Sequence, residues 1–176
     1  KNSDAVAELA LGHIIACDRR IVDASLDLRS GNWKKKAYQN AAGLKGRTLG
    51  IIGLGSIGRA LAKLAKGLNM RVIAWSRSLT PDKADKLDLV YCESIDEVAA
   101  NADVISVHLA VTPDTKHLLN TKFFNKMKDE AIFVNTSRGE IVDTAALHKA
   151  IDEKTLRVGL DVFENEPGSG VAEFDQ

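Results

Sequence analysis

The first part of the chain carries apolar side chains at intervals of three and four residues, from Val6 to Leu28. This spacing places them on one face of a helix and predicts one long helix over residues 4–29. Gly31 follows the last turn, as glycine commonly does just after a helix. Residues 32–47 show no apolar period, so we expect an irregular segment there.

From residue 48 onward, short apolar runs alternate with segments of helical period. The runs predict strands at 48–52, 71–75, 89–92, 103–108, 131–135 and 156–161. Helices are expected at 57–68, at 95–101, from 121 and from 143 to 151, whereas residues 82–88 are expected to form a charged loop. Regular alternation of strands and helices is typical of a parallel sheet covered on both faces. The pattern therefore predicts an α/β fold, a Rossmann-like doubly wound parallel sheet with three α/β/α layers, over residues 48–167.

The composition is that of a single globular domain. The 176 residues include 24 Lys and Arg and 24 Asp and Glu, so the formal net charge is zero and no global basic field favours nucleic acid. No apolar run approaches the ~18 residues that a membrane helix needs. Cys17 and Cys92 stand far apart without metal-ligand spacing, so we expect neither a disulfide nor a metal site. A reducing, cytoplasmic environment fits them best.

A glycine motif, Gly53-x-Gly55-x-x-Gly58, lies where the first predicted strand gives way to a helix. In this context the first glycine permits a tight turn, the second lets a pyrophosphate approach the backbone, and the third lets helix and strand pack closely. The helix N-terminus adds unpaired N–H groups and a partial positive charge for the phosphates. The flanking strand and helix favour a dinucleotide site over the alternative, a glycine-rich turn in an unrelated α/β fold.

The residues after the second strand bear on the choice of dinucleotide. A carboxylate about 20 residues beyond the glycines normally accepts the ribose hydroxyls of NAD, but Ser76, Arg77 and Ser78 stand there instead. Serine and arginine can hydrogen-bond a 2′-phosphate, which a carboxylate would repel. We therefore expect NADP to be favoured, with NAD as the second choice. In the alternative interpretation, Arg77 stacks on the adenine or faces solvent.

Two charged residues follow the last two predicted strands: Arg138 comes after strand 131–135, and Glu166 after strand 156–161. Ligands bind at the carboxyl edge of an open α/β sheet. A guanidinium there can hold a carboxylate and polarise the neighbouring carbonyl, and Glu166 could meet Arg138 in space. The alternative is an ordinary surface ion pair, which contributes little to stability.

Five segments stand in a distinctive order along the chain. They are Asn2-Ser-Asp-Ala-Val-Ala-Glu8, Gly53-Leu-Gly-Ser-Ile-Gly58, Val107-His-Leu-Ala-Val-Thr-Pro113, Asn135-Thr-Ser-Arg-Gly-Glu-Ile-Val-Asp143 and Gly159-Leu-Asp-Val-Phe-Glu-Asn-Glu-Pro167. In this order they resemble the cofactor domain of the D-isomer-specific 2-hydroxyacid dehydrogenases. The resemblance covers essentially the whole chain, and the five segments together are far more specific than any one of them.

The resemblance implies a role for each matching residue. Arg138 corresponds to the arginine that binds the substrate carboxylate and carbonyl, and Glu166 to the carboxylate that partners the family's catalytic histidine. Ser56 and Ile57 correspond to the backbone at the pyrophosphate, and Ser76 to the ribose-binding position. The remaining cofactor-lining positions are Leu109, Ala110, Thr136 and Asp161, the last of these near the nicotinamide carboxamide.

The sequence departs from the family in ways that limit the expected activity. The family's acid/base histidine lies in a Pro-His-x-Gly segment after the Glu-Pro motif, and this chain stops before it. Residues 168–176 are therefore expected to be a truncated tail, and the substrate domain is expected to be absent. His108 is the one serious substitute, but we favour a buried structural histidine there. His117 and His148 are expected at ordinary surface positions.

The chemistry implied for the intact protein is hydride transfer between a nicotinamide and a 2-keto or 2-hydroxy acid of the phosphoglycerate, glyoxylate or hydroxypyruvate class. The alternative function is a non-catalytic, dinucleotide-sensing interaction module of the corepressor type. The chain alone is expected to bind dinucleotide without turnover. Residues 1–47 resemble the family's dimerisation elements and predict a homodimer; in the alternative they pack on their own domain.

Overall fold

The computed structural model describes residues 2–167 and contains the predicted parallel sheet. The strand order is β3-β2-β1-β4-β5-β6, and every neighbouring pair is parallel. In this doubly wound order the direction of winding reverses between β1 and β4, where a crevice forms at the carboxyl edge. The strands are β1 (Thr48–Ile52), β2 (Arg71–Trp75), β3 (Val90–Tyr91), β4 (Val104–Val107), β5 (Ile132–Asn135) and β6 (Arg157–Leu160).

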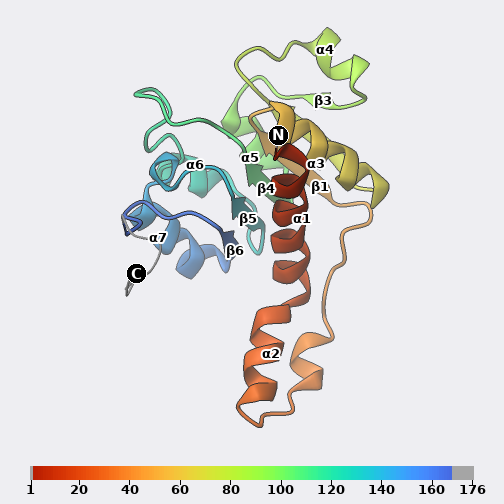
Figure 1. Cartoon of the computed structure of the whole chain (residues 1–176), viewed down its shortest axis with the longest axis vertical. Coiled ribbons are helices and arrows are strands. Elements are labelled where there is room, and N and C mark those ends of the chain that lie inside the picture. Colours follow the sequence, from red (N-terminus) through yellow and green to blue (C-terminus); the bar gives the residue numbers. More distant parts are fainter. Residues whose placement is uncertain (1, 168–176) are drawn as a thin grey trace.

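Helices cover both faces of the sheet and give the three layers expected from the sequence (Figure 1). Successive strand residues point to opposite faces, so Leu49 and Ile51 join one apolar core while Ile105 and Phe133 join the other. The first core includes residues of α1 (Ser3–Arg19), α3 (Ser56–Gly67) and α4 (Pro81–Lys86). The second includes residues of α5 (Ile95–Asn101), α6 (Thr121–Lys126) and α7 (Thr144–Lys154).

The prediction of one helix over residues 4–29 is wrong, because the segment forms two helices. Arg20 adopts a left-handed backbone (φ 51°) that ends α1 and precedes α2 (Ile21–Arg29). α1 packs against α3, β5 and β6, whereas α2 extends away from the sheet and has no buried residue (Figure 1). A 3₁₀ helix, η1 (Lys35–Tyr38), interrupts the segment predicted to be irregular. α1 thus packs on its own domain, as in the alternative interpretation, whereas dimerisation through α2 stays a prediction.

The loop predicted over residues 82–88 is also wrong, because the structure places α4 there. The Thr80 hydroxyl accepts a hydrogen bond from the Lys83 N–H (3.4 Å), and Pro81 takes the first helical position, where a missing N–H costs nothing. Ala84 is the one buried residue of α4. The many charged residues of this segment therefore lie on an exposed helix. This helix places two lysines beside the end of β2.

The amino edge of the sheet, where the strands begin, is closed by charges that pair with one another. Asp18 is only 2% exposed, and its carboxylate accepts a hydrogen bond from Arg47 Nη1 (2.9 Å). Asp103 accepts hydrogen bonds from the Thr48 N–H (2.8 Å) and from Lys128 Nζ (2.8 Å). This edge therefore supplies its own counter-charges.

Neither a membrane-spanning helix nor a metal-binding cluster occurs among residues 2–167. No helix in that range combines the length and apolarity needed to cross a bilayer, and no group of His, Cys, Asp and Glu there could hold a metal ion. Cys17 and Cys92 are free thiols. Burial raises the pKa of both to about 11, so they are protonated at neutral pH.

Candidate functional site

The glycine motif forms the turn between β1 and α3, and its three glycines differ in their surroundings. Gly53 has φ +100°, and a Cβ there would lie 2.3 Å from the His108 carbonyl oxygen. A Cβ at Gly58 would lie 2.4 Å from the Gly53 carbonyl oxygen. Both positions are therefore closed to any side chain. Gly55 has an ordinary φ of −77°, and a Cβ there would meet nothing within 4 Å, so the space beside it is open.

The N-terminus of α3 borders this open space. Ser56 and Ile57 begin the helix, and no side chain caps it, so its first N–H groups can serve an anion. A second helix begins at the same corner, because the Ser3 hydroxyl of α1 donates a hydrogen bond to Ser56 Oγ at 2.9 Å (Figure 1). The positive ends of two helix dipoles therefore meet beside Gly55.

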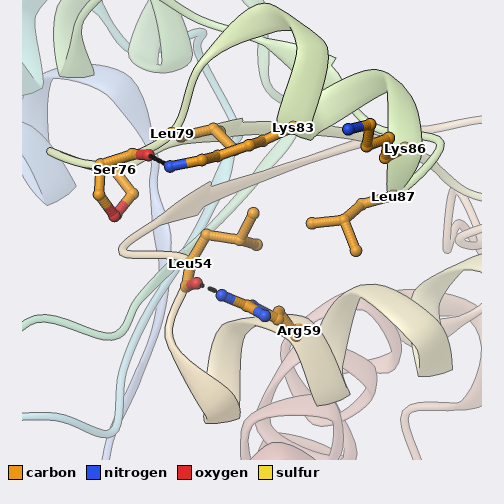
Figure 2. Close-up of a pocket in the computed structure, with 8 residues that line it drawn as sticks. Leu54, Arg59, Ser76, Leu79, Lys83, Lys86 and Leu87 are labelled. Atoms are coloured by element: carbon orange, nitrogen blue, oxygen red, sulfur yellow. Dashed lines mark hydrogen bonds between the residues drawn. The ribbon is translucent and has the colours of Figure 1, made fainter.

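A cavity of about 330 Å³ lies beside the end of β2 (Figure 2). Ser76 and Ser78 line it together with Arg59 of α3 and with Lys83 and Lys86 of α4. Lys83 Nζ donates a hydrogen bond to the Ser78 carbonyl oxygen at 2.8 Å, which ties α4 to the strand end. No carboxylate of the described residues lines this cavity. Its three cations suit a phosphate group.

The sequence pattern predicts this pocket only in part. Its two serines line the cavity, whereas Arg77 is exposed and lies outside the lining. The lysines of α4 are not predicted as site residues, because the sequence pattern assigns this segment to a loop. The Thr80–Pro81 pair, a signal for the start of a helix, could have identified α4. The sequence pattern also does not predict Arg59, which directly follows the motif. The Arg59 Nε donates a hydrogen bond to the Leu54 carbonyl oxygen (3.3 Å), across the turn.

After β5, a hydrogen-bonded turn presents Thr136 and Arg138. The Asn135 side chain accepts hydrogen bonds from the Ser137 N–H (3.0 Å) and hydroxyl (2.8 Å), and donates to the Arg138 carbonyl oxygen (2.9 Å). The exposed Arg138 side chain donates from Nη1 to the Ser137 carbonyl oxygen (2.7 Å). Thr136 is 7% exposed, and its buried hydroxyl has no hydrogen-bond partner within residues 2–167. Such unpartnered buried groups are rare, and this one belongs to the residue directly after β5, at the edge where ligands bind.

Leu109 and Ala110 follow β4 and border the glycine turn. The Leu109 side chain would lie 3.0 Å from a Cβ on Gly53. Ala110 is exposed, and its carbonyl oxygen accepts a hydrogen bond from Thr115 Oγ1 (2.8 Å). The segment after β4 is thus held by its own hydrogen bonds and lies beside the turn that would take the diphosphate.

His108, expected as a buried histidine, follows β4 and is half-buried. Its Nε2 lies 2.9 Å from Ser106 Oγ, and its buried Nδ1 has no partner in the described part of the chain. Burial lowers the pKa of His108 to about 4, so the ring is neutral at pH 7. A ring that is neutral at pH 7 has no extra proton to deliver, and its buried Nδ1 is a second polar atom at this edge without a partner within residues 2–167.

Asp161 and Glu166 lie on the loop after β6, and both are exposed. The Asp161 N–H donates to the Asn135 carbonyl oxygen (3.1 Å), which extends the strand pairing past the sheet edge. The Glu166 carboxylate accepts a hydrogen bond from the Phe163 N–H (2.8 Å). No ion pair joins Glu166 to Arg138 within the described residues, so the meeting of these two side chains stays a prediction.

The groups at the carboxyl edge fit a dinucleotide. The open corner at Gly55 suits a diphosphate, and the cavity beside Ser76 lies at the strand end that takes the ribose in this fold. The unpartnered atoms of Thr136 and His108 offer polar contacts at the ends of β5 and β4. Fold and site together define a dinucleotide-binding domain of the Rossmann type.

Comparison with known proteins narrows this class to one family. The family model described as D-isomer specific 2-hydroxyacid dehydrogenase, NAD binding domain, matches residues 11–174. The chain therefore belongs to this family, and the nicotinamide coenzyme expected from the sequence is confirmed.

Named relatives agree with this assignment. The glyoxylate reductase of Thermococcus litoralis is 44% identical over 172 residues, 94% of this chain and 52% of that protein. The hydroxypyruvate reductase of Thermotoga maritima is 40% identical over 167 residues, 94% of this chain and 53% of that protein. The structure of Salmonella D-lactate dehydrogenase matches with a TM-score of 0.83 and 34% identity, over 91% of this chain and 48% of that one. The chain spans about half the length of these relatives, and nothing in them supports the corepressor alternative.

Proposed function

We propose that this chain is the coenzyme domain of a protein that transfers hydride between a nicotinamide dinucleotide and a small 2-keto or 2-hydroxy acid. One observation carries the proposal: two glycines of the motif are closed, while Gly55 stands open beside two helix N-termini. A diphosphate is the dinucleotide group that this corner fits. The names of the relatives support glyoxylate and hydroxypyruvate as the class of substrate.

The residues after β5 and β6 would handle the acid substrate. When bound, the reduced nicotinamide supplies a hydride from its C4 to the 2-carbon of the keto acid. Arg138 binds the substrate carboxylate and stabilises the negative charge that develops on the carbonyl oxygen, while Asn135 holds the turn that presents it. That oxygen then takes a proton from a histidine whose pKa Glu166 raises. We assign this histidine to none of residues 2–167.

The variant Gly55→Ala tests the diphosphate corner on the 176-residue chain. The backbone at Gly55 suits any residue and an added methyl group is unobstructed, so the free energy of unfolding should change by less than about 1 kcal/mol. The methyl group would stand where the diphosphate lies, so we expect affinity for NADPH to fall about tenfold or more, a loss of about 1.4 kcal/mol. Calorimetric titration and thermal unfolding measure the two effects. Unchanged affinity would refute this placement.

We propose that NADPH binds more tightly than NADH. The serine at position 76 and the three cations around the cavity support a site for the 2′-phosphate. In the Lys83→Met variant, the preference for NADPH should fall about tenfold while the affinity for NADH is kept. Lys63→Met is the matched control, because Lys63 lies on α3 outside this cavity. Wild-type protein that prefers NADH would contradict the proposal.

The enzymatic proposal is tested on the full-length protein that contains this chain. We expect it to oxidise NADPH in the presence of glyoxylate or hydroxypyruvate, and the 176-residue chain to bind NADPH without turnover. Absence of turnover by the full-length protein would remove the enzymatic proposal. Turnover by the 176-residue chain would show that it supplies its own proton donor.

We infer a homodimer that uses α2 and the segment after it. Trp33 is 78% exposed, and four apolar residues of α2 are each about half exposed or more; these are Ile21, Val22, Leu26 and Leu28. Large exposed apolar groups commonly mark an interaction surface. Sedimentation should give the mass of a dimer for the wild type and of a monomer for Leu26→Asp. A monomeric wild type would overturn the inference.

We also infer a cytoplasmic protein. The two thiols are unpaired, and burial keeps both protonated. Unpaired thiols are typical of reducing compartments, which supports this location. Fractionation of the source cells tests it.

A further inference from the structure

The loop after β6 lies directly against the residue that follows Arg138. A Cβ on Gly139 would lie 2.0 Å from the Phe163 carbonyl carbon and 2.4 Å from the Glu164 nitrogen. Only a residue without a side chain allows this approach. The backbone that leads to Glu166 is therefore packed against the backbone next to Arg138.

Side chains hold the same loop from two other elements. The Glu164 carboxylate is hydrogen-bonded to His117 Nε2, and its second oxygen accepts a hydrogen bond from Thr144 Oγ1 at 3.0 Å. Because a carboxylate only accepts, His117 Nε2 must carry a proton. We call His117, Glu164 and Thr144 the Glu164 clamp. It joins the β6 loop to the segment before α6 and to the start of α7.

His117 also contacts the Arg138 segment through its backbone. Its N–H donates to the Glu140 carbonyl oxygen at 2.9 Å, and its φ of +50° is uncommon for a residue other than glycine. One residue thus touches the chain two positions after Arg138 with its backbone, and the chain two positions before Glu166 with its ring. Its predicted place as an ordinary surface histidine does not anticipate these contacts.

Both carboxylate oxygens of Glu164 are engaged in hydrogen bonds of this clamp. The hydrogen bond from His117 holds the pKa of Glu164 below its usual value, Thr144 adds to the effect, and burial and the nearby Asp143 oppose it. Glu164 is therefore an ionised structural acceptor at neutral pH. The other carboxylate of the Glu-Asn-Glu sequence, Glu166, is left on the exposed side of the loop.

We propose that His117 is a positioning residue for the reaction: through Glu164 it fixes where Glu166 stands relative to Arg138. This rests on the roles proposed above for Arg138 and Glu166. His117 touches neither substrate nor coenzyme in this scheme, so its loss should affect the catalytic step more than coenzyme binding.

Hydrogen exchange on the 176-residue chain tests the clamp without any need for turnover. Asparagine tolerates the left-handed backbone but places no donor at the Nε2 position, whereas the amide of glutamine reaches it. In His117→Asn, amides of residues 162–166 should exchange about tenfold faster, while those of β4 keep their rates. His117→Gln should restore slow exchange. Equal exchange in wild type and His117→Asn would overturn the clamp.

Kinetics of the full-length protein test the positioning role. We expect His117→Asn to lower kcat about tenfold with an unchanged KM for the coenzyme, and His117→Gln to recover most of kcat. A second variant, Glu164→Ala, should have the same effect, and combining it with His117→Asn should add nothing further. An unaltered kcat in His117→Asn, or a glutamine variant as slow as the asparagine one, would overturn the proposal. Full-length wild type without turnover would instead refute the proposed function, and hydrogen exchange would still decide the clamp.

Discussion

Both edges of the sheet carry polar residues, but the two edges differ in how those residues are partnered. At the amino edge, the buried Asp18 is paired with Arg47, and the half-buried Asp103 is paired with Lys128. At the carboxyl edge, the Thr136 hydroxyl and His108 Nδ1 are buried without partners among the described residues. The charged groups of the amino edge satisfy one another, whereas these two polar atoms of the carboxyl edge are available to a ligand. Unmet hydrogen-bonding capacity, more than the presence of charge, distinguishes the functional edge from the structural one.

The largest effect on this contrast is expected from breaking the amino edge. Asp18→Asn leaves the Arg47 guanidinium, mostly enclosed, without its counter-charge. We expect the free energy of unfolding, measured with urea, to fall by about 3 kcal/mol. Asp23→Asn is the control, because its pair with Arg20 is exposed and should contribute less than about 1 kcal/mol. NADPH affinity of the folded variant should stay at the wild-type value; a large loss of affinity would show that the two edges are coupled.

A smaller effect is expected when acid protonates the carboxyl edge. Burial lowers the pKa of His108 to about 4 in the folded protein, from an ordinary value of 6.5 for histidine. Between these values the unfolded chain binds a proton that the folded chain rejects, so stability is full above pH 6.5 and falls as the pH drops toward 4. We expect a loss of about 2 kcal/mol between pH 8 and pH 5 from this residue. Urea unfolding at both pH values measures it, and in His108→Gln this part of the pH dependence should vanish.

The smallest effect, and the one that sharpens the contrast most, is expected from Thr136→Val. Valine has nearly the same shape and removes a buried hydroxyl that has no partner within residues 2–167. We expect the free energy of unfolding to rise by about 1 kcal/mol and NADPH affinity to fall by about threefold or more. A variant that is stabilised but binds worse would show that the hydroxyl serves the ligand. Stabilisation with unaltered binding would remove Thr136 from the site.

The sequence predicts those elements of the fold that depend on residues close together in the chain. The glycine motif, the strands and the capped helix that starts after Asp143 are as predicted, because each is encoded by neighbouring residues. The break at Arg20 is not, since no glycine or proline marks its left-handed backbone. The Glu164 clamp has no sequence signal either: His117 and Glu164 are 47 positions apart and meet only through the fold.

The site divides in the same way. Ser76 can be predicted by counting from the glycines, because the βαβ unit fixes that distance. Lys83 and Lys86 depend on α4, whose position beside the segment after β2 brings them to the cavity. Whether Glu166 meets Arg138 depends on long-range packing at Gly139 rather than on either local motif.

The hydrogen-bonded start of α1 and α3, at Ser3 and Ser56, has a consequence for how this corner attracts anions. The attraction there originates in aligned backbone peptide groups, which do not titrate and which are the same whatever side chain a residue carries. This attraction for anions therefore persists when the pH changes or when a charged side chain nearby is replaced. In the proposed site, a change of coenzyme preference is therefore expected from the lysine-lined cavity, where a single substitution changes the charge.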